Sequence, residues 1–215
     1  AFAVGEDVRD WTVNSENICL FPYSDKAELR PASDLANALR FIWRCRTSLL
    51  DRKIFGGETY RETGKAWYSY GQIPAERFKI RTAITFAFVA TYNHFVLDRG
   101  GKVFNRTAPV IKLPAGASED SHLGLLGLLN SSTAGFFLKQ VCFNKGNGGI
   151  GGGISDEHWE LRYEYNASQL VDFPVVENRP LDLATHLDHL ANQLAASQPA
   201  ALLAAAHAGT EALPT

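Results

Sequence analysis

Basic side chains that alternate with aromatic or amide side chains are the strongest chemical signal in this sequence. They form three groups: Arg61 and Lys65 before Trp67-Tyr68, then Arg99, Lys102 and Arg106, and finally Lys145 with Asn147. Arginine and lysine can bind phosphate oxygens or guanine edges, and asparagine can pair with adenine. Any one of these residues alone is more often a solvated loop charge. As groups on neighbouring predicted loops, they favour a surface that meets a nucleic acid.

Three other residue sets could do chemistry, and each has a simpler interpretation. Residues 146–151 match the pattern GxGxxG, but a dinucleotide site requires a strand before this pattern and a helix after it. Here a predicted helix comes first and a strand follows, which favours a surface loop. His186 and His189 lie three residues apart near Asp182, but such histidines on an alanine-rich helix are usually solvated rather than metal ligands. A stand-alone enzyme built around His94 or around the two histidines of the tail stays a further alternative.

The distribution of charge supports a polyanionic partner. The whole chain has 215 residues and a net charge of −2. Residues 1–112 contain 17 Lys and Arg against 12 Asp and Glu, whereas residues 113–215 contain 4 against 11. A basic first half is compatible with one face that meets DNA. The acidic second half, with its leucine-striped helix, would suit a protein-docking module instead.

Composition limits the class of protein further. Hydrophobic residues at 46% and charged residues at 20% are typical of a globular domain. The three cysteines form no CxxC pair, so neither a disulfide framework nor a zinc finger is indicated, and a reducing, cytoplasmic location is expected. No signal peptide or membrane span is predicted. Because the chain contains no methionine, we expect it to be a piece of a longer protein.

The predicted elements alternate irregularly between helix and strand. Ser33 is expected to cap a helix that runs to about Lys53, with Arg46 and Arg52 paired within the fold. Strands are predicted at residues 67–70, 80–90, 93–98, 102–105 and 110–113, with a tight hairpin turn at Arg99-Gly100-Gly101. A helix over residues 121–141, interrupted at 130–132, precedes the glycine-rich loop 146–153 and a strand at 158–165.

Two helices follow, one after Pro180 and one beginning at Pro199. The predicted fold class is therefore α+β, a mixed β-sheet flanked by helices with a C-terminal helical appendage. The predicted domains are residues 1–178 for recognition and residues 179–215 for the alanine- and leucine-rich tail.

Longer stretches of the chain resemble one protein family. These stretches are Gly5–Trp11, Phe21–Tyr23, Leu49–Arg52 before Trp67-Tyr68, Val89–Pro114 and Leu125–Ser132. Together they resemble the C-terminal specificity region of adenine-specific DNA methyltransferases of the phage-growth-limitation type (PglX, in BREX phage-defence systems). That region is similar to the TaqI-like target-recognition domain. The resemblance covers roughly residues 1–178, and Val89–Pro114 is its most specific part.

The resemblance implies a module that recognises a site on double-stranded DNA, while a separate domain uses S-adenosylmethionine to methylate a flipped adenine. It implies no catalysis and no cofactor in this chain, because Phe21-Pro22-Tyr23 lacks the Asn and second Pro of the family's Asn-Pro-Pro-aromatic motif. The expected partners are duplex DNA, the upstream methyltransferase domain and other defence-system subunits. The loops at residues 56–65, 99–106 and 145–154 are expected to reach the DNA.

Overall fold

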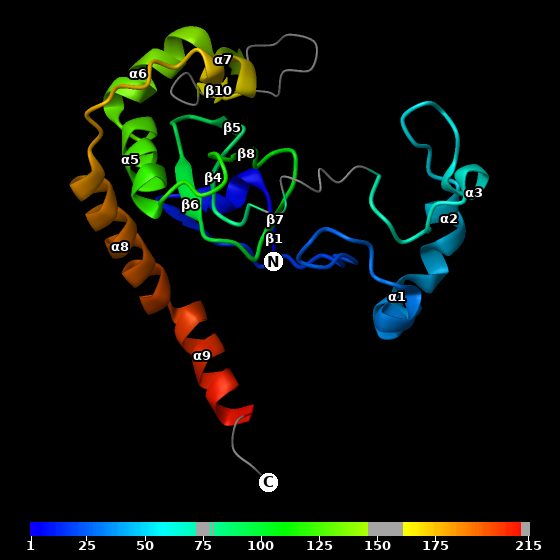
Figure 1. The fold of residues 1–215 in the computed structure, drawn as a ribbon. Helices are drawn as coiled ribbons and strands as arrows, with labels where there is room; N and C mark the ends of the chain where they lie inside the picture. Colours follow the sequence, from blue (N-terminus) through cyan, green and yellow to red (C-terminus); the bar gives the residue numbers. More distant parts are fainter. Residues whose placement is uncertain (72–77, 79, 146–160, 212–215) are drawn as a thin grey trace. The chain divides into compact units, whose positions relative to one another are not determined.

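The computed structural model describes residues 1–71, 78, 80–145 and 161–211 (Figure 1). The chain forms two compact units, which we call unit 1 (Ala1–Asn17 and Thr82–Thr215) and unit 2 (Ile18–Arg81). Helices and several small sheets occur together, so the α+β class predicted from the sequence is confirmed. The predicted boundary between residues 178 and 179 stays a prediction.

A three-stranded antiparallel sheet lies at the centre of unit 1, in the order β6-β4-β8. Strands β4 (Ala83–Phe86) and β6 (Phe95–Asp98) are buried along their whole length, and β8 (Val110–Ile111) pairs with the other side of β4. Facing pairs such as Phe86 and Phe95 contribute to the hydrophobic core. Of the single strand predicted over residues 80–90, the middle forms the buried strand β4, whose side chains have protein on both faces, whereas Val89–Ala90 forms a separate strand of another sheet.

Short strands surround this sheet. β1 (Phe2–Ala3) pairs in parallel with β7 (Val103–Phe104), and β2 (Val8–Arg9) pairs with β3 (Thr12–Val13). A 3₁₀ helix, Gly5–Asp7, separates β1 from β2. The third group is antiparallel in the order β5-β10-β9, formed by Val89–Ala90, Arg162–Glu164 and Phe143–Lys145.

The predicted hairpin at Arg99-Gly100-Gly101 is wrong. β6, which ends at Asp98, pairs with β4, whereas β7, which begins at Val103, pairs with β1. The two glycines have positive φ angles of 109° and 85°, so the chain does turn here. The turn connects two different sheets, since β6 pairs with β4 and β7 pairs with β1.

Two helices, α5 (Glu119–Leu129) and α6 (Ser132–Val141), form the interrupted helix predicted from the sequence. The Ser131 hydroxyl accepts from the Ala134 N–H and donates to the Leu128 carbonyl, so it caps α6. The Asn130 side chain forms two hydrogen bonds, of 2.8 and 3.0 Å, with the main chain of Phe95. The break between the helices therefore also fastens them to β6.

Helix α8 (Leu181–Ser197) packs against α5 in unit 1, and α9 (Pro199–Glu211) follows it (Figure 1). Both helices were predicted. The short α7 (Ala167–Val171) begins at Asn166, whose side chain caps it. A Cβ atom added at Gly127 of α5 would lie 2.7 Å from the Ala184 Cβ of α8, closer than carbon atoms can approach. Glycine at this position therefore allows the two helices to pack closely.

The first predicted helix of unit 2 is not continuous. The predicted helix 33–53 consists of a 3₁₀ turn (Ala32–Leu35), α1 (Ala36–Ile42), a second 3₁₀ turn (Trp43–Cys45) and α2 (Arg46–Leu50), and α3 (Tyr60–Thr63) follows. Ser33 is not the cap that the sequence predicted. Its hydroxyl donates to Asp34, and Pro31 precedes the first turn.

Arg52 holds the second half of unit 2 together. Its guanidinium donates to the carbonyls of Leu49, Trp67 and Ser69, at 3.0, 3.1 and 2.9 Å. It also lies 4.4 Å from the centre of the Tyr60 ring. These contacts confirm the predicted structural role of Arg52. They also show that residues 67–70 form turns around this side chain, so the strand predicted there is wrong.

Candidate nucleic-acid interface

The predicted DNA-binding residues lie in both units. Arg61 and Lys65 belong to unit 2, whereas Arg99, Lys102, Arg106 and Lys145 belong to unit 1. Asn147 and the glycine-rich loop 146–153 lie outside the described residues. What each charged group contacts decides whether it can meet DNA, because a cation already bound to a carboxylate is a poorer phosphate ligand than a free one.

Arg99 follows β6 and links two helices. Its guanidinium donates to Glu119 of α5 at 3.0 and 2.6 Å and to Asp188 of α8 at 2.8 Å. Hydrogen bonds to Asp188 and Glu119 raise the pKa of Arg99 above its ordinary value. The side chain therefore stabilises the packing of α8 within unit 1.

Lys102 and Lys145 also contact carboxylates. The Lys102 ammonium lies 2.8 Å from Asp98, whose side chain is only 2% exposed and also accepts from the Gly100 N–H. The Lys145 ammonium lies 2.7 Å from Glu164 on the neighbouring strand. A buried carboxylate without its cation is costly, so Lys102 above all contributes to the stability of the fold.

The three remaining candidates are exposed. Arg61 of α3 donates from Nε and Nη2 to Asp51, at 3.0 and 2.8 Å, in an exposed ion pair. Lys65 and Arg106 are exposed and form no ion pair with any residue that the structure describes. Exposed pairs contribute little to stability, so Arg61 can exchange Asp51 for a phosphate at low cost. Lys65 and Arg106 can bind one directly.

The excess of basic residues in the first half of the sequence is concentrated in unit 2. Unit 2 contains 12 Lys and Arg against 7 Asp and Glu, a net charge of +5, and the rest of the chain carries −7. The first 112 residues carry the same net charge of +5, but unit 2 carries it within 64 residues, because residues 1–17 (−3) and 82–112 (+3) cancel. A basic unit of 64 residues is the better candidate for contact with a polyanion.

Sequence reasoning missed one exposed group in unit 2, around the turn between α1 and α2. It consists of Arg40, Phe41, Trp43, Arg44 and Arg46. Arg46 was expected to be paired inside the fold, and this prediction is wrong. The 3₁₀ turn at Trp43–Cys45 has fewer residues per turn than an α-helix, which shifts Arg46 out of the apolar stripe into solvent. The sequence does contain one indication of this group, because residues 35–50 include three arginines and no aspartate or glutamate.

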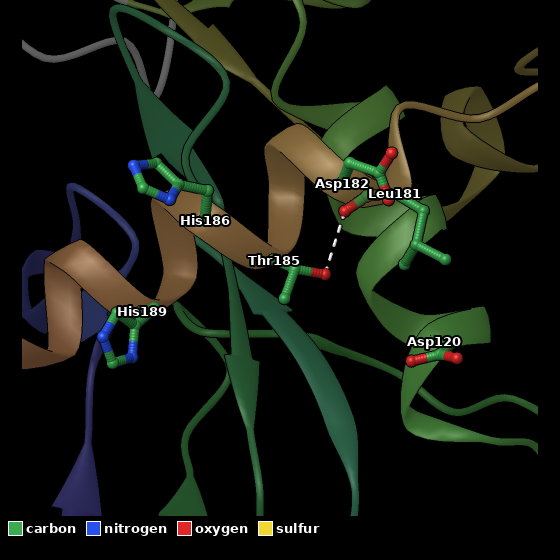
Figure 2. Close-up of a pocket in the computed structure, with 6 residues that line it drawn as sticks. All are labelled: Asp120, Leu181, Asp182, Thr185, His186 and His189. Atoms are coloured by element: carbon green, nitrogen blue, oxygen red, sulfur yellow. Dashed lines mark hydrogen bonds between the residues drawn. The ribbon is translucent and has the colours of Figure 1, made fainter.

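A pocket between α5 and α8 contains the histidines considered above. Figure 2 shows the imidazole rings of His186 and His189 well apart from the carboxylates of Asp120 and Asp182. The Thr185 hydroxyl donates to the Leu181 carbonyl at 2.9 Å and is already satisfied. Across the described parts of the chain, no three His, Cys, Asp or Glu side chains gather as a metal site would require.

Among the helices that the structure describes, none is long and apolar enough to span a bilayer. The cysteines Cys19, Cys45 and Cys142 are free thiols.

Comparison with known proteins gives one informative similarity. No known family profile matches the chain. The chain is 45% identical, over 206 residues, to the adenine-specific methyltransferase PglX of Streptomyces coelicolor. This match covers 94% of the chain but only 17% of that protein's length. The chain is therefore similar to a small segment of an adenine-specific methyltransferase. The resemblance to PglX-type methyltransferases is confirmed at that level, and the TaqI-like recognition domain stays a prediction.

Proposed function

We propose that this chain is the duplex-DNA target-recognition module of an adenine-specific DNA methyltransferase that acts in phage defence in the cytoplasm. The observation that carries the proposal is the 45% identity to PglX along nearly the whole chain. The net charge of +5 on unit 2 supports it, because neutralisation of phosphates supplies a large share of the affinity with which proteins bind DNA. The α+β architecture is compatible with a TaqI-like recognition domain.

In this proposal the chain recognises a site, and another part of a longer enzyme transfers the methyl group. The described residues do not fit S-adenosylmethionine. The sequence lacks the Asn-Pro-Pro-aromatic motif, and the pocket of Figure 2 is lined by Asp and His side chains on two helix faces. We therefore place both the cofactor and the transfer of the methyl group in the methyltransferase domain of the longer enzyme.

The candidate residues divide by role. Exposed Lys65 and Arg106, with Arg61 after it leaves Asp51, would bind phosphate oxygens and fix the register of the protein on the duplex. Base recognition would fall to side chains on the loops, where each good bidentate pair contributes about 1–3 kcal/mol of discrimination. Asn147 remains a proposed base-reading residue because its amide can pair with adenine.

The test is binding of a labelled DNA duplex by the 215-residue chain across a salt series, measured by fluorescence anisotropy. We expect the logarithm of the binding constant to fall linearly with the logarithm of the salt concentration. Lys65→Ala/Arg106→Ala should weaken binding and flatten this slope. The variant is chosen because neither side chain has an ion-pair partner among the described residues, so its loss should leave the fold intact. Binding that is absent at low salt, or insensitive to salt, would contradict the proposal.

A second candidate function is docking of other subunits of the same defence complex. Five leucines on α8 and α9 favour it, because each is between 45% and 62% exposed and can pack on a partner: Leu183, Leu190, Leu194, Leu202 and Leu203. Exposed apolar surface of this kind often marks a protein interface. Association through these leucines would persist at high salt, which separates it from DNA binding in the same titration.

A further inference from the structure

Five consecutive or nearly consecutive exposed side chains form what we call the ridge: Arg40, Phe41, Trp43, Arg44 and Arg46. They lie at the end of α1, in the following 3₁₀ turn and at the start of α2, in the part of Figure 1 labelled α1 and α2. Phe41 is 72% exposed and Trp43 is 59% exposed. Large aromatic rings exposed to this extent contribute little to a core, so their position requires another explanation.

The rings hold the arginine side chains in place. The Arg44 guanidinium carbon lies 5.6 Å from the centre of the Phe41 ring, and that of Arg46 lies 5.1 Å from the centre of the Trp43 ring. Trp43 is itself fixed by an edge-to-face contact with Trp67, at 5.8 Å between ring centres. A guanidinium stacked on a ring keeps its N–H groups at the edge free to donate. The stacking also reduces the side-chain entropy that ligand binding would cost.

The ridge has a local charge that fits an anion. Residues 35–50 contain three arginines and no aspartate or glutamate. None of these arginines forms an ion pair within the described residues. Arg61 and Arg81 of the same unit differ, since each lies beside an aspartate. Among the described residues, the three guanidiniums of the ridge therefore have no carboxylate partner, and they lie on the more basic unit.

We propose that the ridge binds the phosphodiester backbone of duplex DNA and that Phe41 and Trp43 act by orienting the arginines. The inference rests on the proposed function and adds to it a surface that no sequence pattern assigned. Arginine suits this role because its planar group donates two parallel hydrogen bonds to a phosphate. Contact with the backbone carries no sequence information. Removal of the ridge should therefore weaken binding equally for all DNA sequences.

The test compares two variants that each remove two positive charges from unit 2. Arg44→Ala/Arg46→Ala removes the two ring-stacked arginines. The control, Lys26→Ala/Arg81→Ala, removes two exposed cations close to acidic residues, since Arg81 pairs with Asp25. Binding of the full 215-residue chain to two duplexes of unrelated sequence is measured across a salt series. Circular dichroism confirms that both variants are folded.

We expect the ridge variant to weaken binding on the order of tenfold or more at low salt, to the same extent for both duplexes. Its salt slope should be smaller in magnitude by about 1.8, because each phosphate that one of the two arginines neutralises contributes about 0.9. The control should change both quantities far less. Phe41→Ala removes only an exposed ring, and it should weaken binding several-fold because Arg44 then has no ring to support it. When Phe41→Ala is added to the Arg44→Ala/Arg46→Ala variant, it should weaken binding no further.

Two failures can be told apart. If the wild-type chain binds duplex DNA and the ridge variant binds as the control does, the ridge inference is overturned while the proposed function stands. If the wild-type chain does not bind duplex DNA at low salt, the proposed function fails and the ridge inference fails with it. A ridge variant that weakens binding to one duplex but not the other would overturn the assignment to the backbone.

Discussion

Replacement of Arg99 by alanine should loosen the packing of α8 within unit 1. Arg99 donates to Asp188 and Glu119 at 2.8 and 2.6 Å. The Asp188 side chain is only 7% exposed, and its second oxygen, Oδ1, has no hydrogen-bond partner among the described residues. Removal of the guanidinium therefore leaves a nearly buried carboxylate without a counter-charge.

The size of the effect follows from the burial of the two partners. Breaking a fully buried ion pair costs about 3–5 kcal/mol. Because the Arg99 side chain is 43% exposed, water can replace part of its interaction, and we expect a decrease of about 2–3 kcal/mol in the free energy of unfolding. This corresponds to a fall in Tm of roughly 4–12 °C for a chain of this size.

The assay is thermal unfolding followed by circular dichroism, together with hydrogen exchange of the α8 amides. Arg106→Ala is the matched control, since Arg106 is exposed and unpaired among the described residues, and its Tm should stay close to that of the wild type. Asp188→Asn in the Arg99→Ala background should recover at least half of the missing stability. An Arg99→Ala protein with the Tm of the control and unchanged protection of α8 would refute this reasoning.

Three further predictions concern other parts of the fold. Gly127→Val should push α8 away from α5, because even a Cβ atom would lie 2.7 Å from Ala184; we expect a destabilisation of about 1–3 kcal/mol, and unchanged exchange of the α8 amides would contradict it. Burial, with the nearby Arg9 charge second, lowers the pKa of His94 below 6.5, so the unfolded chain binds the proton more tightly. The stability from His94 should be complete above pH 6.5 and be lost as pH falls towards the lowered pKa, a dependence that thermal melts of His94→Gln should no longer show. Arg52→Ala should destabilise unit 2 selectively, by about 2–4 kcal/mol, because it removes three hydrogen bonds to carbonyl groups and the contact with Tyr60. Hydrogen-exchange protection that falls equally in unit 1 would contradict this.

The elements that were predicted correctly from the sequence are those determined by residues close together in the sequence. The break between α5 and α6 follows from Ser131, whose hydroxyl caps the next helix three residues on. The buried strand β4 follows from an apolar run that has no helical period. The prediction of a hairpin at Arg99 was wrong because β7, at Val103–Phe104, pairs with β1, at Phe2–Ala3 near the start of the sequence. Strand partners so far apart in sequence leave no local pattern to read.

For the candidate interface, the sequence predicts which residues are basic but not which carboxylates they contact. The sequence shows that Arg99 and Lys102 are basic and lie near a turn. It does not show that Asp188, 89 residues later, and buried Asp98 bind them. The ridge was missed for a related reason. A helix with one regular period would have turned Arg46 inward, and the 3₁₀ turn at Trp43–Cys45 changes which side chains meet solvent.

The central claim is that this chain selects a DNA sequence, and selection from a random duplex library tests it most directly. The 215-residue chain is immobilised and incubated with the library at low salt, and the retained duplexes are amplified and sequenced over several rounds. We expect enrichment of one short sequence motif above the starting library. Retention of duplexes with no enriched motif, or no retention at all, would contradict the claim.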